Sequence, residues 1–264
     1  MTEKLLDVEN LTMKFGGLVA IDNLSFSAAK DQITSIIGPN GAGKTTVFNC
    51  LTGFYKATAG SMFLNKENER LNLKKFSDFK VAQKAGVART FQNIRLFPQM
   101  SVLENMMVAQ HNKLMTASGF SILGLINSKS YLQKEKEAME ISKYWLDIIG
   151  LTNRADDNAG DLPYGDQRKL EIVRAMCIEP HLLCLDEPAA GLNAKESAEL
   201  NKLLKFIKND KKTGILLIEH DMSVVMGISD HVVVLNYGKK IFEGTASETK
   251  NSPEVIEAYL GTED

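Results

Sequence analysis

The residues best suited to chemistry form the stretch 38–46, in which a glycine is followed by four residues and then by glycine, lysine and threonine. This spacing is typical of a loop that binds nucleotide phosphates, because its glycines let successive backbone N–H groups turn toward phosphate oxygens. The loop lies between a predicted buried strand over residues 33–37 and a predicted helix that stops at Gly53. The positive end of that helix adds to the attraction for an anion. We therefore predict a nucleotide site here.

Two side chains of this loop have roles set by their chemistry. Lys44 is expected to reach the β- and γ-phosphates, and the Thr45 hydroxyl is expected to hold Mg²⁺. The residues predicted to bind the nucleotide in this loop are Gly38, Asn40, Gly41, Ala42, Gly43, Lys44, Thr45 and Thr46.

A second candidate element ends in two carboxylates. Residues 182–187 read as a fully buried strand that finishes with Asp186 and Glu187. An aspartate at the carboxyl end of a parallel strand beside the glycine loop is placed to hold Mg²⁺, and the next glutamate can orient or deprotonate an attacking water. Acidic strand ends are common, so this pattern gains its weight from the glycine loop upstream.

Two further side chains have both a chemical and a structural interpretation. Phe15 ends a predicted strand and could stack on a base, although most aromatic residues in such places belong to the core. His220 lies at the end of a predicted buried strand over residues 214–221, where a single histidine is more often a structural residue than a catalytic one. The residues alone leave both alternatives open.

The elements that position these residues follow from the hydrophobic pattern. Residues 5–15 and 21–28 partly alternate apolar and polar side chains, which predicts antiparallel strands. The charged stretch 65–75 reads as a solvated loop. A hairpin is expected over residues 232–242, followed by a short C-terminal helix.

A mostly helical insert is predicted over residues 97–162. It opens with a capping box at Ser101, and apolar residues recur later at spacings of three and four. Its middle, residues 117–130, is small and apolar and reads either as buried filler or as a surface for a partner protein.

Composition narrows the functional class. The 264 residues include 44% hydrophobic ones, enough for a sizeable core, and the formal net charge is -2. Nucleic-acid binders usually carry a basic excess, so no nucleic-acid partner is expected. The three cysteines show no metal-like spacing and predict buried, reduced thiols in a cytosolic setting.

The chain has no apolar run of the ~20 residues that span a bilayer. Its first seven residues carry charges where an export signal needs an apolar stretch. If the protein works at a membrane, we expect it to do so through a partner.

Taken together, five motifs in this order resemble the ATP-binding cassette (ABC) ATPases over nearly the whole chain. They are the loop at 38–45, Gln92 after a strand, residues 162–165 before a helix, residues 182–187, and His220. The resemblance implies an α/β P-loop NTPase (RecA-like) core with an antiparallel β-subdomain, over 1–96 and 163–264, and an inserted helical subdomain over 97–162.

The same resemblance implies roles in ATP hydrolysis. Phe15 is expected to stack on adenine, Gln92 to join Mg²⁺ to the helical subdomain, and Asp186 to support the metal. Glu187 is expected to be the catalytic base, and His220 to contact the γ-phosphate.

The signature segment, residues 162–166, is expected to complete the ATP site of a second ABC subunit, with Tyr164 and Gly165 at the nucleotide. Here Pro163, Tyr164 and Asp166 replace the usual Ser, Gly and Gln. Proline lacks an N–H and a hydroxyl, and Asp166 places a negative charge near the phosphates. Asn193 likewise replaces a more usual aspartate, so we expect a working but slower site.

Within this family, the Pro-Tyr-Gly signature, residues 89–93 and 187–193 and the long segment over about 110–145 resemble the ATPase subunit of branched-chain amino acid importers. The alternative is the ATPase of lipopolysaccharide export. Either implies transmembrane permease subunits as partners, a second ATPase subunit that is identical or related, and a place on the cytoplasmic face of the membrane. The importer also implies a solute-binding protein, reached indirectly.

Two rival interpretations come from other classes. In the soluble cassette proteins that act on ribosomes or DNA, one chain resembles two cassettes in tandem, or a cassette split by a long coiled coil. This chain has neither feature. A regulatory module that holds ATP without hydrolysing it is the other rival, because the signature is altered.

Overall fold

The computed structural model describes residues 3–66, 69–77, 79–117 and 129–260. The chain divides into two compact units, the first made of Met1–Gln92 with Pro180–Asp264 and the second of Asn93–Glu179. The prediction from the sequence instead assigned residues 93–96 and 163–179 to the nucleotide-binding core. The boundaries of a compact unit need not be those of a functional domain. The functional boundaries at 97 and 162 stay a prediction.

The first unit begins with a four-stranded antiparallel sheet in the order β2-β1-β4-β5. Its strands are β1 (Lys4–Phe15), β2 (Leu18–Ala29), β4 (Ala59–Lys66) and β5 (Glu69–Asn72). The expected antiparallel opening is therefore present. The expected loop over 65–75 is wrong in part, because it holds the end of β4, all of β5 and a 3₁₀ turn (Leu73–Lys75).

The charges that suggested a loop stabilise an edge strand instead. Arg70 in β5 lies 2.6 Å from a carboxylate oxygen of Glu9 and stacks 3.9 Å from the ring centre of Phe63. Edge strands commonly carry charged side chains, which discourage pairing with other chains.

A six-stranded sheet forms the centre of the same unit, in the order β10-β9-β3-β8-β7-β6. Neighbouring strands are parallel except for β10, which is antiparallel to β9. Every residue of β3, β7 and β8 is buried. The strands are β3 (Ile33–Ile37), β6 (Val87–Arg89), β7 (Leu182–Asp186), β8 (Gly214–Ile218), β9 (His231–Asn236) and β10 (Lys239–Gly244).

This strand order explains how distant motifs meet. Because β3, β8 and β7 are parallel neighbours, their carboxyl ends lie at one edge of the sheet. The glycine loop follows β3, Asp186 ends β7, and His220 comes two residues after β8.

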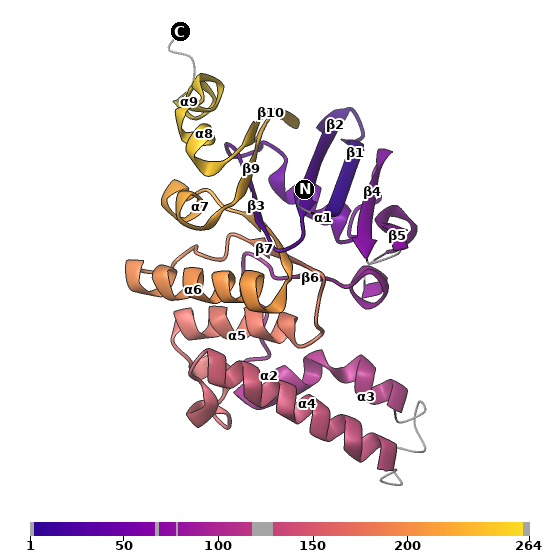
Figure 1. Cartoon of the computed structure of the whole chain (residues 1–264), viewed down its shortest axis with the longest axis vertical. Coiled ribbons are helices and arrows are strands. Elements are labelled where there is room, and N and C mark those ends of the chain that lie inside the picture. Colours follow the sequence, from indigo (N-terminus) through magenta and orange to yellow (C-terminus); the bar gives the residue numbers. More distant parts are fainter. Residues whose placement is uncertain (1–2, 67–68, 78, 118–128, 261–264) are drawn as a thin grey trace. The chain divides into compact units, whose positions relative to one another are not determined.

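Five α-helices lie in the described part of the first unit. One core cluster joins apolar side chains from both sheets with Val47, Phe48 and Leu51 of the helix after the glycine loop. Figure 1 shows the two C-terminal helices beside the β9–β10 hairpin, against which they pack. The helices are α1 (Lys44–Leu51), α6 (Ala194–Lys211), α7 (Met222–Ile228), α8 (Ala246–Asn251) and α9 (Pro253–Leu260).

The second unit is helical, as expected for the insert. Ser101 caps its first helix in a reciprocal capping box with Glu104, which confirms the predicted start. The helices are α2 (Val102–Ala109), α3 (His111–Ala117), α4 (Lys129–Ile148) and α5 (Tyr164–Met176), and 3₁₀ turns lie at Thr152–Arg154 and Ala159–Asp161. A short π-helical turn (Val81–Ala85) belongs to the first unit. Of the apolar stretch 117–130, residues 118–128 lie outside the described residues.

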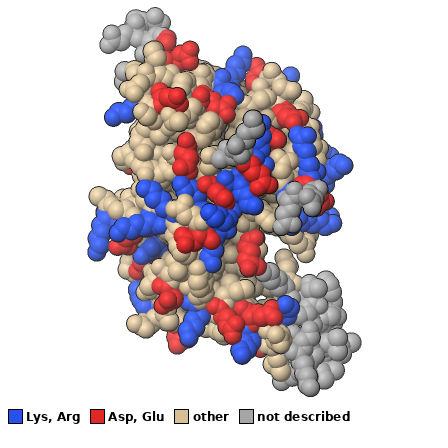
Figure 2. Space-filling model, viewed as in Figure 1, with Lys and Arg blue, Asp and Glu red and all other residues tan. Residues whose placement is uncertain are grey.

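The surface carries both signs of charge. On the face drawn in Figure 2, basic and acidic side chains are interspersed, in keeping with a formal net charge of -2. Among the described residues, no helix combines the length and the apolar character needed to cross a bilayer.

Candidate nucleotide-binding and hydrolysis site

The glycine loop is shaped by positions that tolerate little besides glycine. Gly38 has φ +148°, and a Cβ placed there would lie 2.1 Å from the carbonyl oxygen of Leu235. Gly43 has φ +100° and begins α1 without a side-chain cap, so the first-turn N–H groups are free to face an anion. Asn40, Gly41 and Thr45 of the loop are exposed, while Ala42 is buried and Thr46 half-buried.

Lys44 is held against the loop by its own ammonium group. Its Nζ donates to the carbonyl oxygens of Gly38, at 2.7 Å, and Pro39, at 3.0 Å. Burial lowers the pKa of Lys44, while the charges of Glu187 and Asp186 act in the opposite direction. A buried ammonium near the first turn of a helix gives the loop a fixed positive charge for phosphate oxygens.

The three predicted catalytic side chains meet at one carboxylate. The Gln92 Nε2 donates to the Glu187 Oε2 at 2.8 Å, and the His220 Nδ1 lies 3.6 Å from the same oxygen. The side chain of His220 is 56% exposed, so it is not a buried structural residue. Glu187 itself has φ +48°, an uncommon left-handed conformation for a non-glycine residue.

Asp186 has a partner that the sequence did not reveal. An Arg89 guanidinium nitrogen lies 2.9 Å from Asp186 Oδ2, and both side chains are 7% exposed. Arg89 also donates to Asn49 at 2.6 Å and Thr52 at 3.2 Å, and lies 4.9 Å from the ring centre of Phe91. The pairing follows from β6 lying beside β7, which a sequence without strand order cannot give.

Glu219 is a second residue that sequence reasoning missed. It is fully buried between Ile218 and His220, and its Oε1 accepts the backbone N–H of Ala189 at 2.8 Å. Burial raises the pKa of Glu219, and the nearby charge of Glu187 acts in the same direction. The bond to Ala189 ties the segment after β7 to the segment after β8, which carry Glu187 and His220.

Phe15 lies at the end of β1 and is 41% exposed. Its ring meets that of Tyr55 edge-to-face, with 5.1 Å between ring centres. The core interpretation of Phe15 is therefore wrong. Stacking of this partly exposed ring on adenine stays a prediction.

The signature residues lie in the second unit, at the start of α5. Tyr164 is 44% exposed, and its hydroxyl oxygen accepts a bond from the buried Arg168 at 3.2 Å. Arg168 in turn pairs with the buried Glu171 at 2.9 Å. Gly165 is buried beside them.

The charge of Asp166 is compensated locally. Its carboxylate lies 2.9 Å from the Lys169 ammonium, one turn further along α5. Pro163 precedes this helix and accepts the backbone N–H groups of Asp166 and Gln167. Asp166 is thus less of an obstacle to a phosphate than the sequence alone suggested.

The cysteines are buried thiols, as expected. Cys50, Cys177 and Cys184 are all free. Burial raises the pKa of Cys50 to about 11 and that of Cys184 to about 12. Neither is a reactive thiolate at neutral pH.

Comparison with known proteins defines the class. A family model described as ABC transporter matches residues 21–190, and one described as branched-chain amino acid ATP-binding cassette transporter matches residues 239–264. The chain belongs to the ABC transporter family, and it is an ATP-hydrolysing transporter subunit with the P-loop ABC ATPase fold that the motifs predicted.

The relatives specify the branch. The chain is 49% identical to the high-affinity branched-chain amino acid transport ATP-binding protein LivG of Escherichia coli (strain K12), over 99% of both chains. It is 47% identical, with the same coverage, to BraF of Pseudomonas aeruginosa, which carries the same description. These matches confirm the branch predicted from the sequence.

Solved structures agree with the fold. The ADP conformation of MJ1267, an ATP-binding cassette of an ABC transporter, superposes with a TM-score of 0.83 at 32% identity, covering 98% of this chain and all of that one. A nucleotide-free ATP-binding cassette from an ABC transporter gives 0.81 at 33% identity, covering 98% and 99%.

Proposed function

We propose that this chain is the ATPase subunit of an importer for branched-chain amino acids and that it drives a membrane permease by binding and hydrolysing ATP. The observation that carries hydrolysis is the contact of Gln92 and His220 with the carboxylate of Glu187. The Glu187 side chain is 19% exposed, and the Gln92 amide donates a hydrogen bond to its carboxylate. A carboxylate held in this way is placed to orient and deprotonate a water. The named relatives favour the branched-chain importer over lipopolysaccharide export.

The donor set fits a magnesium ion that accompanies ATP. Thr45, Gln92 and Asp186 offer a hydroxyl, an amide oxygen and a carboxylate, which are the oxygen ligands that Mg²⁺ prefers, and Mg²⁺ usually takes few protein ligands beside phosphate oxygens. When bound, the ion would neutralise charge on the phosphates. The protein's own contribution is to hold the triphosphate between Lys44 and the α1 N-terminus.

A second ATPase subunit completes the proposed site. The start of α5 exposes Tyr164, with Gly165 buried beside it, and the backbone N–H groups of this first turn have no side-chain cap. A helix N-terminus attracts an anion, so it suits the γ-phosphate of ATP bound to another subunit. ATP binding would then favour a closed pair, and hydrolysis would reopen it.

The partners and place follow from this function. The chain would act at the cytoplasmic face of the membrane on transmembrane permease subunits, with a solute-binding protein on the other side. Neither partner requires a membrane-spanning helix in the ATPase itself.

Uptake of labelled leucine, isoleucine and valine tests the proposal in cells that lack this chain. We expect uptake to return when the wild-type chain is supplied and to stay absent with Glu187→Gln, which keeps the shape of the side chain but cannot accept a proton. The purified complex of that variant should bind ATP with near wild-type affinity while releasing phosphate at least about 100-fold more slowly.

Three results would each contradict a different part of the proposal. Unchanged uptake of all three amino acids without the chain would remove the importer assignment. Phosphate release by Glu187→Gln near the wild-type rate would remove Glu187 as the base, and no release by the wild-type complex would favour the regulatory module.

A further inference from the structure

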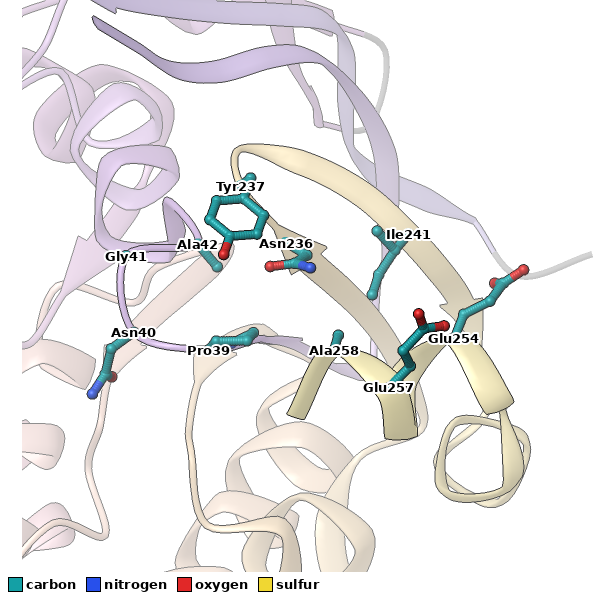
Figure 3. A pocket seen from close by; sticks show the side chains of 10 residues that line it. All are labelled: Pro39, Asn40, Gly41, Ala42, Asn236, Tyr237, Ile241, Glu254, Glu257 and Ala258. Carbon is teal, nitrogen blue, oxygen red and sulfur yellow. The ribbon is translucent and has the colours of Figure 1, made fainter. Parts of the chain in front are cut away.

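Glu219 is a fully buried carboxyl group close to the proposed hydrolysis site. It follows β8 directly, and its side chain is 0% exposed. By contrast, Figure 3 shows Glu254 and Glu257 of α9 lining a cavity of about 700 Å³ on the outer side of the glycine loop, where both residues are exposed. Burying a carboxyl group costs free energy unless its oxygens are hydrogen-bonded, so the partner of Glu219 is informative.

The segment after β7 carries few groups that could hold it in place. Residues 188–192, which follow Glu187, are Pro-Ala-Ala-Gly-Leu and include no polar side chain. Two backbone bonds lie within the segment, from the Ala190 N–H to the Glu187 carbonyl at 3.2 Å and from the Leu192 N–H to the Ala189 carbonyl at 3.1 Å. These bonds curl the segment, but they do not attach it to the sheet.

The end of β8 supplies that attachment. The backbone N–H of Glu187 donates to the carbonyl oxygen of Ile218 at 2.9 Å. The backbone N–H of Ala189 donates to the Glu219 Oε1 at 2.8 Å. The next residue, His220, places its Nδ1 3.6 Å from the Glu187 Oε2. Three consecutive residues therefore contact the segment that carries the proposed base, through a carbonyl, a carboxyl group and an imidazole.

The backbone of Glu187 requires such an attachment. Its φ of +48° is a left-handed conformation, which a non-glycine residue keeps only where its surroundings enforce it. The bond to Ile218 fixes Glu187 itself, and the bond from Ala189 fixes the chain two residues later. Without the second bond the backbone of Glu187 would be free to relax, and its carboxylate would move away from Gln92 and His220.

We propose that Glu219 is a positioning residue for ATP hydrolysis, which acts through the Ala189 backbone to keep the Glu187 carboxylate against His220. Glu219 need not touch ATP or the attacking water for this role. The inference rests on the proposed function of Glu187 as the base. The glycine loop takes no part in these bonds, so loss of the Glu219 bond should lower turnover and not ATP binding.

Phosphate release by the assembled transporter tests the inference with two substitutions at this position. Glu219→Gln keeps an oxygen that accepts the Ala189 N–H, whereas Glu219→Met has a similar length and lacks that oxygen. We expect Glu219→Met to lower kcat roughly 10- to 100-fold, as displacement of a catalytic group by about 1 Å does, while KM for ATP changes less than about twofold. Glu219→Gln should keep kcat within about threefold of the wild type.

Thr213 supplies a matched control at the opposite end of the same strand. It precedes β8 and is 3% exposed, and its Oγ1 donates to the carbonyl oxygen of Pro180, before β7, at 3.2 Å. Thr213→Val thus removes a buried bond between the segments that lead into the same two strands. It should lower the melting temperature and leave kcat unchanged. A fall in kcat equal to that of Glu219→Met would overturn the inference, because general loosening would explain both.

A double variant shows whether Glu219 acts through Glu187. Once Glu187→Gln has removed the base, adding Glu219→Met should slow phosphate release by less than about twofold more. Multiplied losses would overturn the inference. If Glu219→Met does not fold, Glu219→Asp withdraws the carboxyl group by one methylene and should show the same fall in kcat, and an unchanged kcat would again overturn the inference.

Failure of the proposed function would give a different result. Phosphate release by Glu187→Gln at the wild-type rate would remove the base and, with it, the role of Glu219. Slow release by Glu187→Gln together with a wild-type kcat for Glu219→Met would overturn the role of Glu219 alone. Both measurements follow ATP hydrolysis, so they do not depend on which solute is transported.

Discussion

Replacing Arg89 by alanine should lower the stability of the protein, because it removes one partner of a buried ion pair. Arg89 and Asp186 form an ion pair with both side chains 7% exposed. Removal of one partner leaves the other charge buried without compensation, which typically costs about 3–5 kcal/mol. The variant also loses the bonds from Arg89 to Asn49 and Thr52. We therefore expect the free energy of unfolding to fall by at least about 3 kcal/mol.

Arg70 supplies the matched control. It pairs with Glu9 at 2.6 Å, but the two side chains are 51% and 52% exposed. Exposed pairs contribute about 0–1 kcal/mol, so Arg70→Ala should have a correspondingly small effect. Both variants replace an arginine by alanine, and the two sites differ in how deeply the ion pair is buried.

Urea unfolding followed by far-UV circular dichroism measures both variants. The chain has one tryptophan, Trp145 on α4, so its fluorescence reports on the second unit separately. A loss below about 1 kcal/mol for Arg89→Ala, or a loss equal to that of Arg70→Ala, would refute the reasoning from burial.

The remaining predictions concern single residues. Gly38→Ala should abolish detectable ATP binding in a nucleotide titration, because its Cβ would lie 2.1 Å from the Leu235 carbonyl; retained affinity would contradict the loop geometry. His220→Ala should slow phosphate release by the assembled transporter about 100-fold, and undiminished release would remove its proposed γ-phosphate role. Burial raises the pKa of Glu219 above its ordinary 4.5, so wild-type stability should fall as pH rises from 4.5 through the raised value. Glu219→Gln should lack this fall in thermal unfolding between about pH 4.5 and 7.5, and parallel curves would refute the assignment.

Local signals in the sequence predicted the local features well. The capping boxes at Ser101 and Asn193 each depend on residues three positions apart, and both are present with their reciprocal bonds. The glycine loop and the acidic end of β7 could be found for the same reason. Their meeting at one edge of the sheet needed only the general rule for parallel strands.

Features that depend on strand neighbours could not be predicted in this way. Arg89 and Asp186 are 97 positions apart, and their pairing requires β6 to lie beside β7. The charged composition of residues 65–75 predicts a loop. The strand β5 forms instead because its charged side chains contact β1 and β4, and no local pattern reveals those contacts. The burial of Glu219 likewise depends on the segment that carries Ala189.

The left-handed backbone of Glu187 has a consequence for how this position behaves under selection. A residue with φ +48° is strained relative to glycine, which adopts this conformation freely. Variants with glycine here would relax the backbone while losing the carboxylate, so they should fold better and hydrolyse less. A screen for abundance alone would therefore enrich inactive chains at this position, and only a screen coupled to transport would retain the glutamate.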